Sequence, residues 1–208
     1  MYIEDSTFTI VAVDVKEREK GVAICTYRPA VGNRAPFARS GAGAVATQAH
    51  TNPHHGPRVL ELLAQGLTPE RAIELVLEDD PDRDRRQLLC VDAKGRGGAF
   101  TGSYTQEWKG HRVGEGYVVG GNMLTGPEVL TAMAATFESS TGPLYVRLLK
   151  ALRSGLEAGG DRRGSHSAAL VVAKPGFYPY IDLRVDFDPD PLTRLEYITQ
   201  EYIKRILE

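Results

Sequence analysis

The sequence predicts a layered α+β fold built mainly from antiparallel sheets. Segments with strand patterns come in consecutive groups joined by short turns, which favours antiparallel pairing. Segments with helical patterns come in pairs, so the order is strand hairpin, two helices, strands, two helices, strand hairpin. Grouped helices favour separate layers over alternating βαβ units, and this excludes a Rossmann fold and a TIM barrel.

Strands dominate the beginning of the chain. Thr7–Val15 alternates and is rich in β-branched residues, and Gly21–Tyr27 returns as a second strand after the charged turn 16–20. The prolines and glycine of 29–40 predict an irregular excursion. Ala42–Ala46 is small and apolar between glycines, which indicates a buried strand.

Two helices and further strands follow. A short helix is predicted over Arg58–Ala64, and a second is capped by Thr68, starts at Pro69 and runs to Leu77. Arg85–Asp92 and Gly98–Thr101 form another strand pair. Tyr117–Val119 is a short strand that leads into Gly120-Gly121-Asn122, where we expect a tight strand exit.

The last third repeats the pattern. Helices are predicted over 127–138 and 143–158, the second stopped by two glycines, and strands over 168–173 and 180–186. Apolar residues three and four positions apart make about 190–207 an amphipathic helix, which packs on the core or on a second subunit. We expect residues 1–208 to form a single domain and favour a homodimer.

Composition excludes several function classes. The net charge is −2 and no block of lysine and arginine occurs, so no nucleic acid is expected as partner. No apolar run approaches the roughly 20 residues that span a bilayer, and the polar start MYIEDS does not resemble a signal peptide. Cys25 and Cys90 lie in apolar segments, which suits buried thiols in a reducing cytoplasm.

A polar cluster follows the strand that begins near Gly41. The segment GAGAVATQAHTNPHHG turns polar at Thr47 and Gln48 and continues through Asn52 and His55. Polar groups at the end of a buried strand are held on a rigid scaffold, which favours a functional site. The alternative is a polar loop that caps the helix beginning near Pro57.

A second candidate site lies in the turn 161–167. Asp161 and Arg162 could hold a carboxylate or orient an amide, or the turn could be an exposed surface pair. His166 and Ser167 are adjacent, so on a strand they should point to opposite faces and not hydrogen-bond to each other. A metal site from His50, His54, His55 and Asp161 remains an alternative, although no recognised ligand spacing supports it and Pro53 separates the histidines.

Six sequence blocks stand out along the chain: TFTIVAVD, GVAICTYRPAVGNRAPFARSGAGAVATQAHTNP, RQLLCVDAKGR, FTG, GYVVGGNMLTGPEV and AGGDRRG. Together they closely resemble the domain-of-unknown-function family 1028, and the resemblance runs from Thr7 to about Asp190. That family is regarded as Ntn-hydrolase-like. The resemblance therefore implies a four-layer αββα sandwich, and it implies no particular reaction because the family's activity is largely unassigned.

Ntn hydrolases use an N-terminal nucleophile whose own α-amine is the general base, and the matching residue here is Thr7. The chain departs from the pattern because MYIEDS precedes Thr7, and because no lysine occurs between Gly32 and Gly56. It also has Gly120 and His166 at positions where the family pattern leads us to expect glutamine, which could change the substrate.

Two functions follow from this resemblance and from the polar clusters. The first is a hydrolase of a small amide or other C–N bond, acting on a small-molecule substrate without cofactor or metal. Thr7, or Thr26 or Ser167 without cleavage, would be the nucleophile. The catalytic set is Thr7, Asn122 and Asp161, and the substrate-binding set is Gln48, Asn52, His55, Arg162 and His166. The second is a non-catalytic binding protein on the same scaffold.

Overall fold

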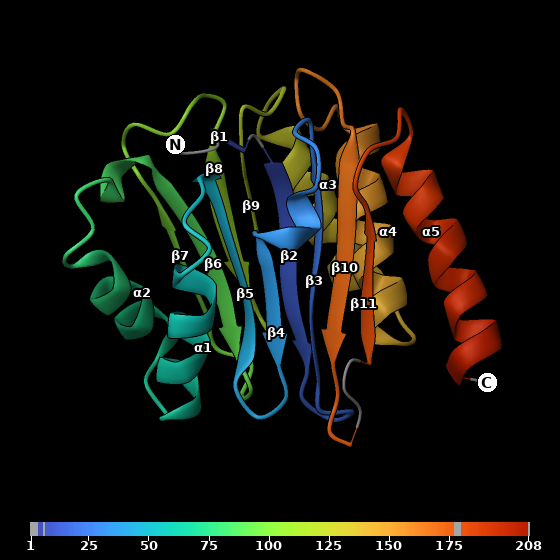
Figure 1. Ribbon diagram of the computed structural model, residues 1–208, viewed down its shortest axis with the longest axis horizontal. Helices are drawn as coiled ribbons and strands as arrows, with labels where there is room; N and C mark the ends of the chain where they lie inside the picture. The colour runs from blue at the N-terminus through green and yellow to red at the C-terminus, as the bar shows by residue number, and fades with distance from the viewer. Residues whose placement is uncertain (1–3, 6, 177–179, 208) are drawn as a thin grey trace.

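Two antiparallel sheets stack face to face and helices cover their outer faces (Figure 1). This computed structural model describes residues 4, 5, 7–176 and 180–207. Within them the chain forms five α-helices and two sheets, so a mixed α+β fold with antiparallel sheets is confirmed. Most of the MYIEDS segment, including Ser6, lies outside the described residues.

The larger sheet has six strands in the order β11-β10-β3-β2-β9-β8, with β2 and β3 at its centre. The predicted first hairpin is confirmed, since β2 and β3 pair along their whole lengths. The strands are β2 (Thr7–Asp14), β3 (Glu19–Thr26), β8 (Gly110–Gly114), β9 (Tyr117–Asn122), β10 (Ser167–Ala173) and β11 (Ile181–Val185).

The smaller sheet has five strands and is organised around β5. Along one edge, β5 pairs first with β4 and, nearer its C-terminal end, with the two-residue β1. Along the other edge it pairs with β6, and β6 pairs in turn with β7. The strands are β1 (Glu4–Asp5), β4 (Pro36–Arg39), β5 (Gly43–His50), β6 (Arg86–Asp92) and β7 (Gly97–Thr101).

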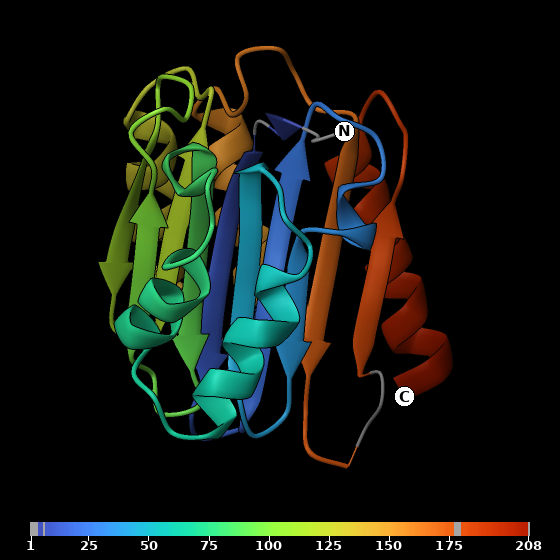
Figure 2. The same cartoon turned by 60° about the vertical axis from the view of Figure 1, so that its left-hand side comes forward.

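Helices lie on the outer side of each sheet. Figure 2 shows α1 (His55–Ala64) and α2 (Pro69–Leu77) in front of the smaller sheet. On the larger sheet lie α3 (Glu128–Ser139) and α4 (Leu144–Glu157), and α5 (Pro191–Tyr202) packs against β10 and β11. Short helical turns occur at Val31–Asn33, Arg83–Arg85 and Ile203–Leu207.

Local sequence signals account for the helix ends. The Thr68 side chain accepts a hydrogen bond from the Arg71 N–H at 3.4 Å, and Pro69 is the first residue of α2, as predicted. Gly159 and Gly160 follow α4 with φ of +117° and +54°, values that glycine adopts without steric cost.

Several predicted boundaries are wrong. Residues 36–39 form an edge strand inside the supposed irregular segment, and Pro36 fits there because it stands first in the strand. The polar Gln48 belongs to β5, and Gly120-Gly121-Asn122 belongs to β9, so both sets lie within strands. Helix α1 begins at His55, three residues before Arg58.

The space between the sheets is apolar over most of its length. Val11, Val22 and Val118 of the larger sheet meet Ala46 and Leu89 of the smaller one. A second cluster, centred on Phe8 and Met133, lies between the larger sheet and its helices. No helix among the described residues is long and apolar enough to cross a membrane.

Candidate functional site

The intersheet space becomes polar towards the first residue of β2. Along β2, Val13 and Val11 lie in the apolar intersheet cluster, while Thr9 hydrogen-bonds to Gln48 of the opposite sheet. Side chains two residues apart on a strand share a face, so Thr7 also faces the other sheet. Thr7 and Thr9 are fully buried.

Gln87 of β6 is the centre of the polar contacts. Its Oε1 accepts hydrogen bonds from the side-chain amides of Gln48, at 2.8 Å, and Asn122, at 3.1 Å. Its Nε2 faces the Thr101 hydroxyl and the Gly121 carbonyl oxygen, each at 2.9 Å. With the 2.6 Å bond from the Thr9 hydroxyl to Gln48, these contacts link five strands of the two sheets.

Thr7 lies between two polar neighbours in the larger sheet. It is opposite Thr26 of β3 on one side and Asn122 of β9 on the other. All three positions are at the same end of the sheet. The Asn122 amide gives one hydrogen bond to Gln87 and retains a second N–H. A hydroxyl and an amide donor are therefore placed side by side.

Strand β1 lies at the same end of the molecule. Glu4 and Asp5 pair with His50 and Ala49, the last residues of β5, while Thr7 belongs to the opposite sheet. The described residues on the two sides of position 6 therefore belong to different sheets. Ser6, the other residue of the predicted cleavage bond, lies outside the described residues.

Asp161 is buried beside the end of β3. Its Oδ2 accepts a hydrogen bond from the Tyr27 N–H at 3.2 Å, and its Oδ1 accepts one from the Arg163 N–H at 2.9 Å. The Arg163 guanidinium lies over the Tyr27 ring at 4.5 Å. Arg162 is exposed, so Arg163 is the arginine that packs next to Asp161.

His166 lies at the rim of this region. Its Nδ1 is 3.2 Å from the Tyr27 carbonyl oxygen, and its ring packs between Tyr27 and Phe187. The Ser167 hydroxyl donates instead to the Arg28 carbonyl oxygen at 2.6 Å. The expected separation of His166 from Ser167 is confirmed.

Asn52 and His55 belong to a different cluster, at the start of α1. His55 Nε2 is 3.1 Å from the Asp80 carboxylate and 3.1 Å from the Asn52 side-chain nitrogen. Arg86 binds Asp80 through Nε at 2.8 Å and also donates to the His50 carbonyl oxygen. The cluster therefore fixes the end of β5 and the start of α1.

Burial and charge shift the pKa values in this cluster. Burial lowers the pKa of His55, and the attraction of Asp80 opposes this shift only in part. Burial would raise the pKa of Asp80, but hydrogen bonds from the Arg86 side chain and the Asp82 N–H outweigh it and lower that pKa. The pair thus combines a neutral imidazole with a carboxylate already occupied by Arg86.

A small cavity lies beside Asn122, the β9 neighbour of Thr7. A cavity of about 10 Å³ is lined by Ala49, Met123 and Asn122 among others. Ala49 and Met123 have φ of +64° and +55°, which are unusual for residues other than glycine. Such backbone geometry at two neighbouring strand ends is typical of functional sites.

Two other chemistries find no support in the described residues. No group of three or more His, Cys, Asp and Glu side chains is placed to hold a metal ion in the part of the chain that is described. Cys25 approaches Asp161, but it is fully buried and burial raises the pKa of its thiol to about 12. A thiol of that kind is a poor nucleophile.

The structure brings part of the predicted set together. Thr7, Asn122 and Gln48 lie along one polar layer. Asp161 lies next to that layer, beside Thr26 and Tyr27. Asn52 and His55 lie apart from it, in the cluster around Asp80. The sequence analysis missed Gln87. A polar residue directly before the apolar run 88–91 of the predicted strand was the available signal.

Comparisons with known proteins agree on one family. The family model described as "Family of unknown function (DUF1028)" matches residues 7–195. A crystal structure of protein SPO2555 from Silicibacter pomeroyi, of the same family, is similar with a TM-score of 0.90 and 36% sequence identity. The similarity covers 95% of this chain and 86% of that one. No curated protein matches the chain significantly.

Proposed function

This chain belongs to the family of unknown function DUF1028, and from that premise we propose that it is an Ntn-type hydrolase of a small amide or other C–N bond. One observation carries the proposal. Thr7 is the first residue of a central strand, and it faces the polar end of the intersheet space beside Asn122. If the α-amine of Thr7 were free, it would stand next to the Thr7 hydroxyl and could act as the general base.

We also propose that the two sheets and their helices form a four-layer αββα sandwich of the Ntn-hydrolase type. Helices α1 and α2 cover one sheet and α3 and α4 cover the other, which supports an αββα sandwich of the Ntn type. In such a sandwich the nucleophile opens a strand of a central sheet, as Thr7 does in β2. The family match also begins at Thr7.

The reaction requires MYIEDS to be removed. While Ser6 is joined to Thr7, the Thr7 nitrogen is an amide and cannot accept a proton. Once free, the α-amine with a pKa of roughly 8 takes the hydroxyl proton as Thr7 attacks the substrate carbonyl. The proton passes to the leaving amine as the C–N bond breaks, and water then hydrolyses the threonine ester.

Neighbouring residues take supporting roles in this scheme. The second N–H of Asn122 is available to the oxyanion, and Asp161 is placed to orient the Thr26–Tyr27 segment. Gln48 is engaged by Thr9 and Gln87, so it acts by holding Asn122 through Gln87. His166 and Arg162 are at the rim, where the distal part of a substrate would lie.

A non-catalytic binding role is the second candidate. The small cavity beside Asn122 and the complete burial of Thr7 favour it for a chain that retains its first six residues. Such a protein would bind its ligand without turnover. The two candidates therefore differ in whether a free Thr7 amine ever forms.

Intact mass and N-terminal sequencing of freshly purified protein test the proposal. We expect the wild-type chain to begin at Thr7 and a Thr7→Ala variant to keep MYIEDS, because the Thr7 hydroxyl would attack the preceding peptide bond. Thr131→Ala, an exposed change on α3, should process as wild type. If wild type and Thr7→Ala both begin at Met1, self-processing is excluded.

A further inference from the structure

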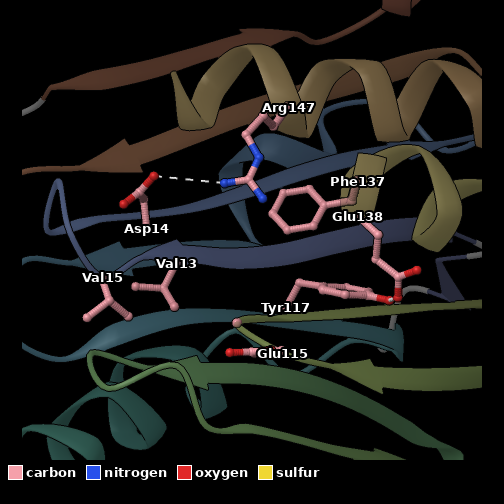
Figure 3. A pocket seen from close by; sticks show the side chains of 9 residues that line it. Val13, Asp14, Val15, Glu115, Tyr117, Phe137, Glu138 and Arg147 are labelled. Atoms are coloured by element: carbon pink, nitrogen blue, oxygen red, sulfur yellow. Dashed lines mark hydrogen bonds and ion pairs between the residues drawn. The ribbon is translucent and has the colours of Figure 1, made fainter. Parts of the chain in front are cut away.

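A second cleft lies at the opposite end of β2 from Thr7 (Figure 3). Its volume is about 500 Å³, far larger than the cavity near Thr7. It is lined by the end of β2, the turn before β9, the end of α3 and one residue of α4. These residues are Val13, Asp14, Val15, Glu115, Tyr117, Phe137, Glu138 and Arg147, with Gly116.

Arg147 enters this cleft without a full set of acceptors. Its guanidinium lies over the Phe137 ring at 4.2 Å, and its closest ionic contact is Asp14 at 3.8 Å, beyond hydrogen-bond distance. Its side chain is 21% exposed, and Nε is buried with no hydrogen-bond partner among the described residues. Because Nε is buried, a ligand could reach only the terminal nitrogens, and Nη1 stands 3.8 Å from Asp14 without a hydrogen bond to it. An oxygen acceptor from outside the protein would fit there.

Carboxylates line the other side of the cleft. Glu138 accepts a hydrogen bond from the Tyr117 hydroxyl, lies 4.0 Å from the guanidinium of exposed Arg112 and stays half exposed, and Glu115 is exposed nearby. Figure 3 shows Arg147 and Asp14 on one side and Glu138 with Tyr117 on the other. The lining carries three carboxylates and one guanidinium, so it favours a ligand that is neutral or positive overall.

We propose that this cleft binds a small molecule of the amino-acid class, its carboxylate on Arg147 and its ammonium group on Glu138 and Glu115. Val13, Val15 and the Phe137 ring supply apolar contacts for the carbon chain between the charged ends. Basic amino acids should bind better than neutral ones, and acidic ones worst, because of the three carboxylates. This site is separate from the one at Thr7 and does not depend on the proposed hydrolysis.

Titration calorimetry of the full-length protein with L-lysine, L-alanine and L-glutamate tests the proposal. Wild type should bind in the order lysine, alanine, glutamate. Arg147→Met should weaken lysine binding by about ten-fold or more, since the carboxylate loses its partner. Arg71→Gln, which removes an exposed arginine on α2, should bind as wild type.

Thermal unfolding without ligand separates a binding role from a structural one. If Arg147 serves a ligand, methionine should pack on Phe137 and leave the unfolding temperature unchanged or raised. Should Arg147→Met fail to fold, Glu138→Gln decides, because loss of the preference for lysine supports the site and an unchanged preference overturns it. The proposal is also overturned if none of the three amino acids binds at millimolar concentration, if glutamate binds as tightly as lysine, or if folded Arg147→Met binds lysine as wild type does.

Discussion

At the scale of single residues, Gln87 shows how much the candidate site depends on one buried amide. It contacts Gln48, Asn122 and Thr101 and lies directly before the apolar run 88–91 of β6. Buried amides that lose a partner cost roughly 1–3 kcal/mol each. The polar layer between the sheets is therefore stabilising only while it is complete.

Gln87→Leu should lower the free energy of unfolding by about 2–5 kcal/mol, because the donors of Gln48 and Asn122 lose their common acceptor. Urea unfolding monitored by circular dichroism measures the change. Gln200→Leu, on the exposed side of α5, is the matched control and should change stability by less than about 0.5 kcal/mol. Equal stability of the two variants would show that the amide contacts contribute nothing.

The His55–Asp80 cluster predicts a pH dependence. The folded-state pKa of His55 is below its unfolded value near 6.5, so the unfolded chain binds the proton more tightly. Stability is fully present above pH 6.5 and is lost as the pH falls from there through the folded pKa. Asp80, also with a lowered pKa, adds a loss of the same sign below its unfolded value of 3.8.

His55→Gln should therefore reduce the fall in unfolding free energy between neutral pH and pH about 5. Urea unfolding at several pH values gives this slope for the variant and for wild type. His54→Gln is the control, since His54 is an exposed neighbour on the same turn. If His55→Gln leaves the slope unchanged and His54→Gln alters it, His54 causes the pH dependence and the prediction is contradicted.

At the scale of elements, the close pairing of β5 with β6 limits where a side chain can be added. A Cβ on Gly43 would lie 2.1 Å from the Val91 carbonyl oxygen, which belongs to the paired strand β6 and cannot move away freely. Gly66 has open space around it, and its φ of +93° alone makes a side chain costly. Gly43 is therefore required by lack of space and Gly66 by its backbone conformation.

Gly43→Ala should destabilise the protein by more than about 3 kcal/mol, because β5 and β6 must separate locally. Gly66→Ala should cost roughly 1–2 kcal/mol through backbone strain alone. Thermal or urea unfolding of both variants provides the comparison. Equal losses would mean that the contact with Val91 is relaxed without cost.

The sequence predicted most elements but fewer of their ends. Strong periodicity and Thr68-Pro69 located α2, and the alternating, β-branched segment 7–15 located β2. Strand β8, GHRVG, was missed because its side chains are mostly exposed and carry no alternating pattern. Gln48 was expected in the polar cluster that follows the strand 42–46, yet its hydrogen bonds across the sheets let it lie fully buried within β5.

At the scale of the whole molecule, the sheet register explains the candidate site. Thr7, Thr26 and Asn122 are far apart in sequence, and antiparallel pairing of β2 with β3 and β9 makes them neighbours. The resemblance to the family indicated Thr7 and the polar end of the strand 117–122 indicated Asn122, whereas no local pattern could show that His55 pairs with Asp80. The Arg147 cleft likewise joins four separate segments, so no local motif predicted it.

The most direct test of the central claim uses a chain produced to begin at Thr7. Release of amine from a panel of small linear and cyclic amides is measured for this chain and for its Thr7→Ala counterpart. We predict turnover by the threonine chain only, rising with pH as the α-amine loses its proton near a pKa of roughly 8. No turnover by the Thr7 chain, or equal turnover by both chains, would contradict a nucleophilic role for Thr7.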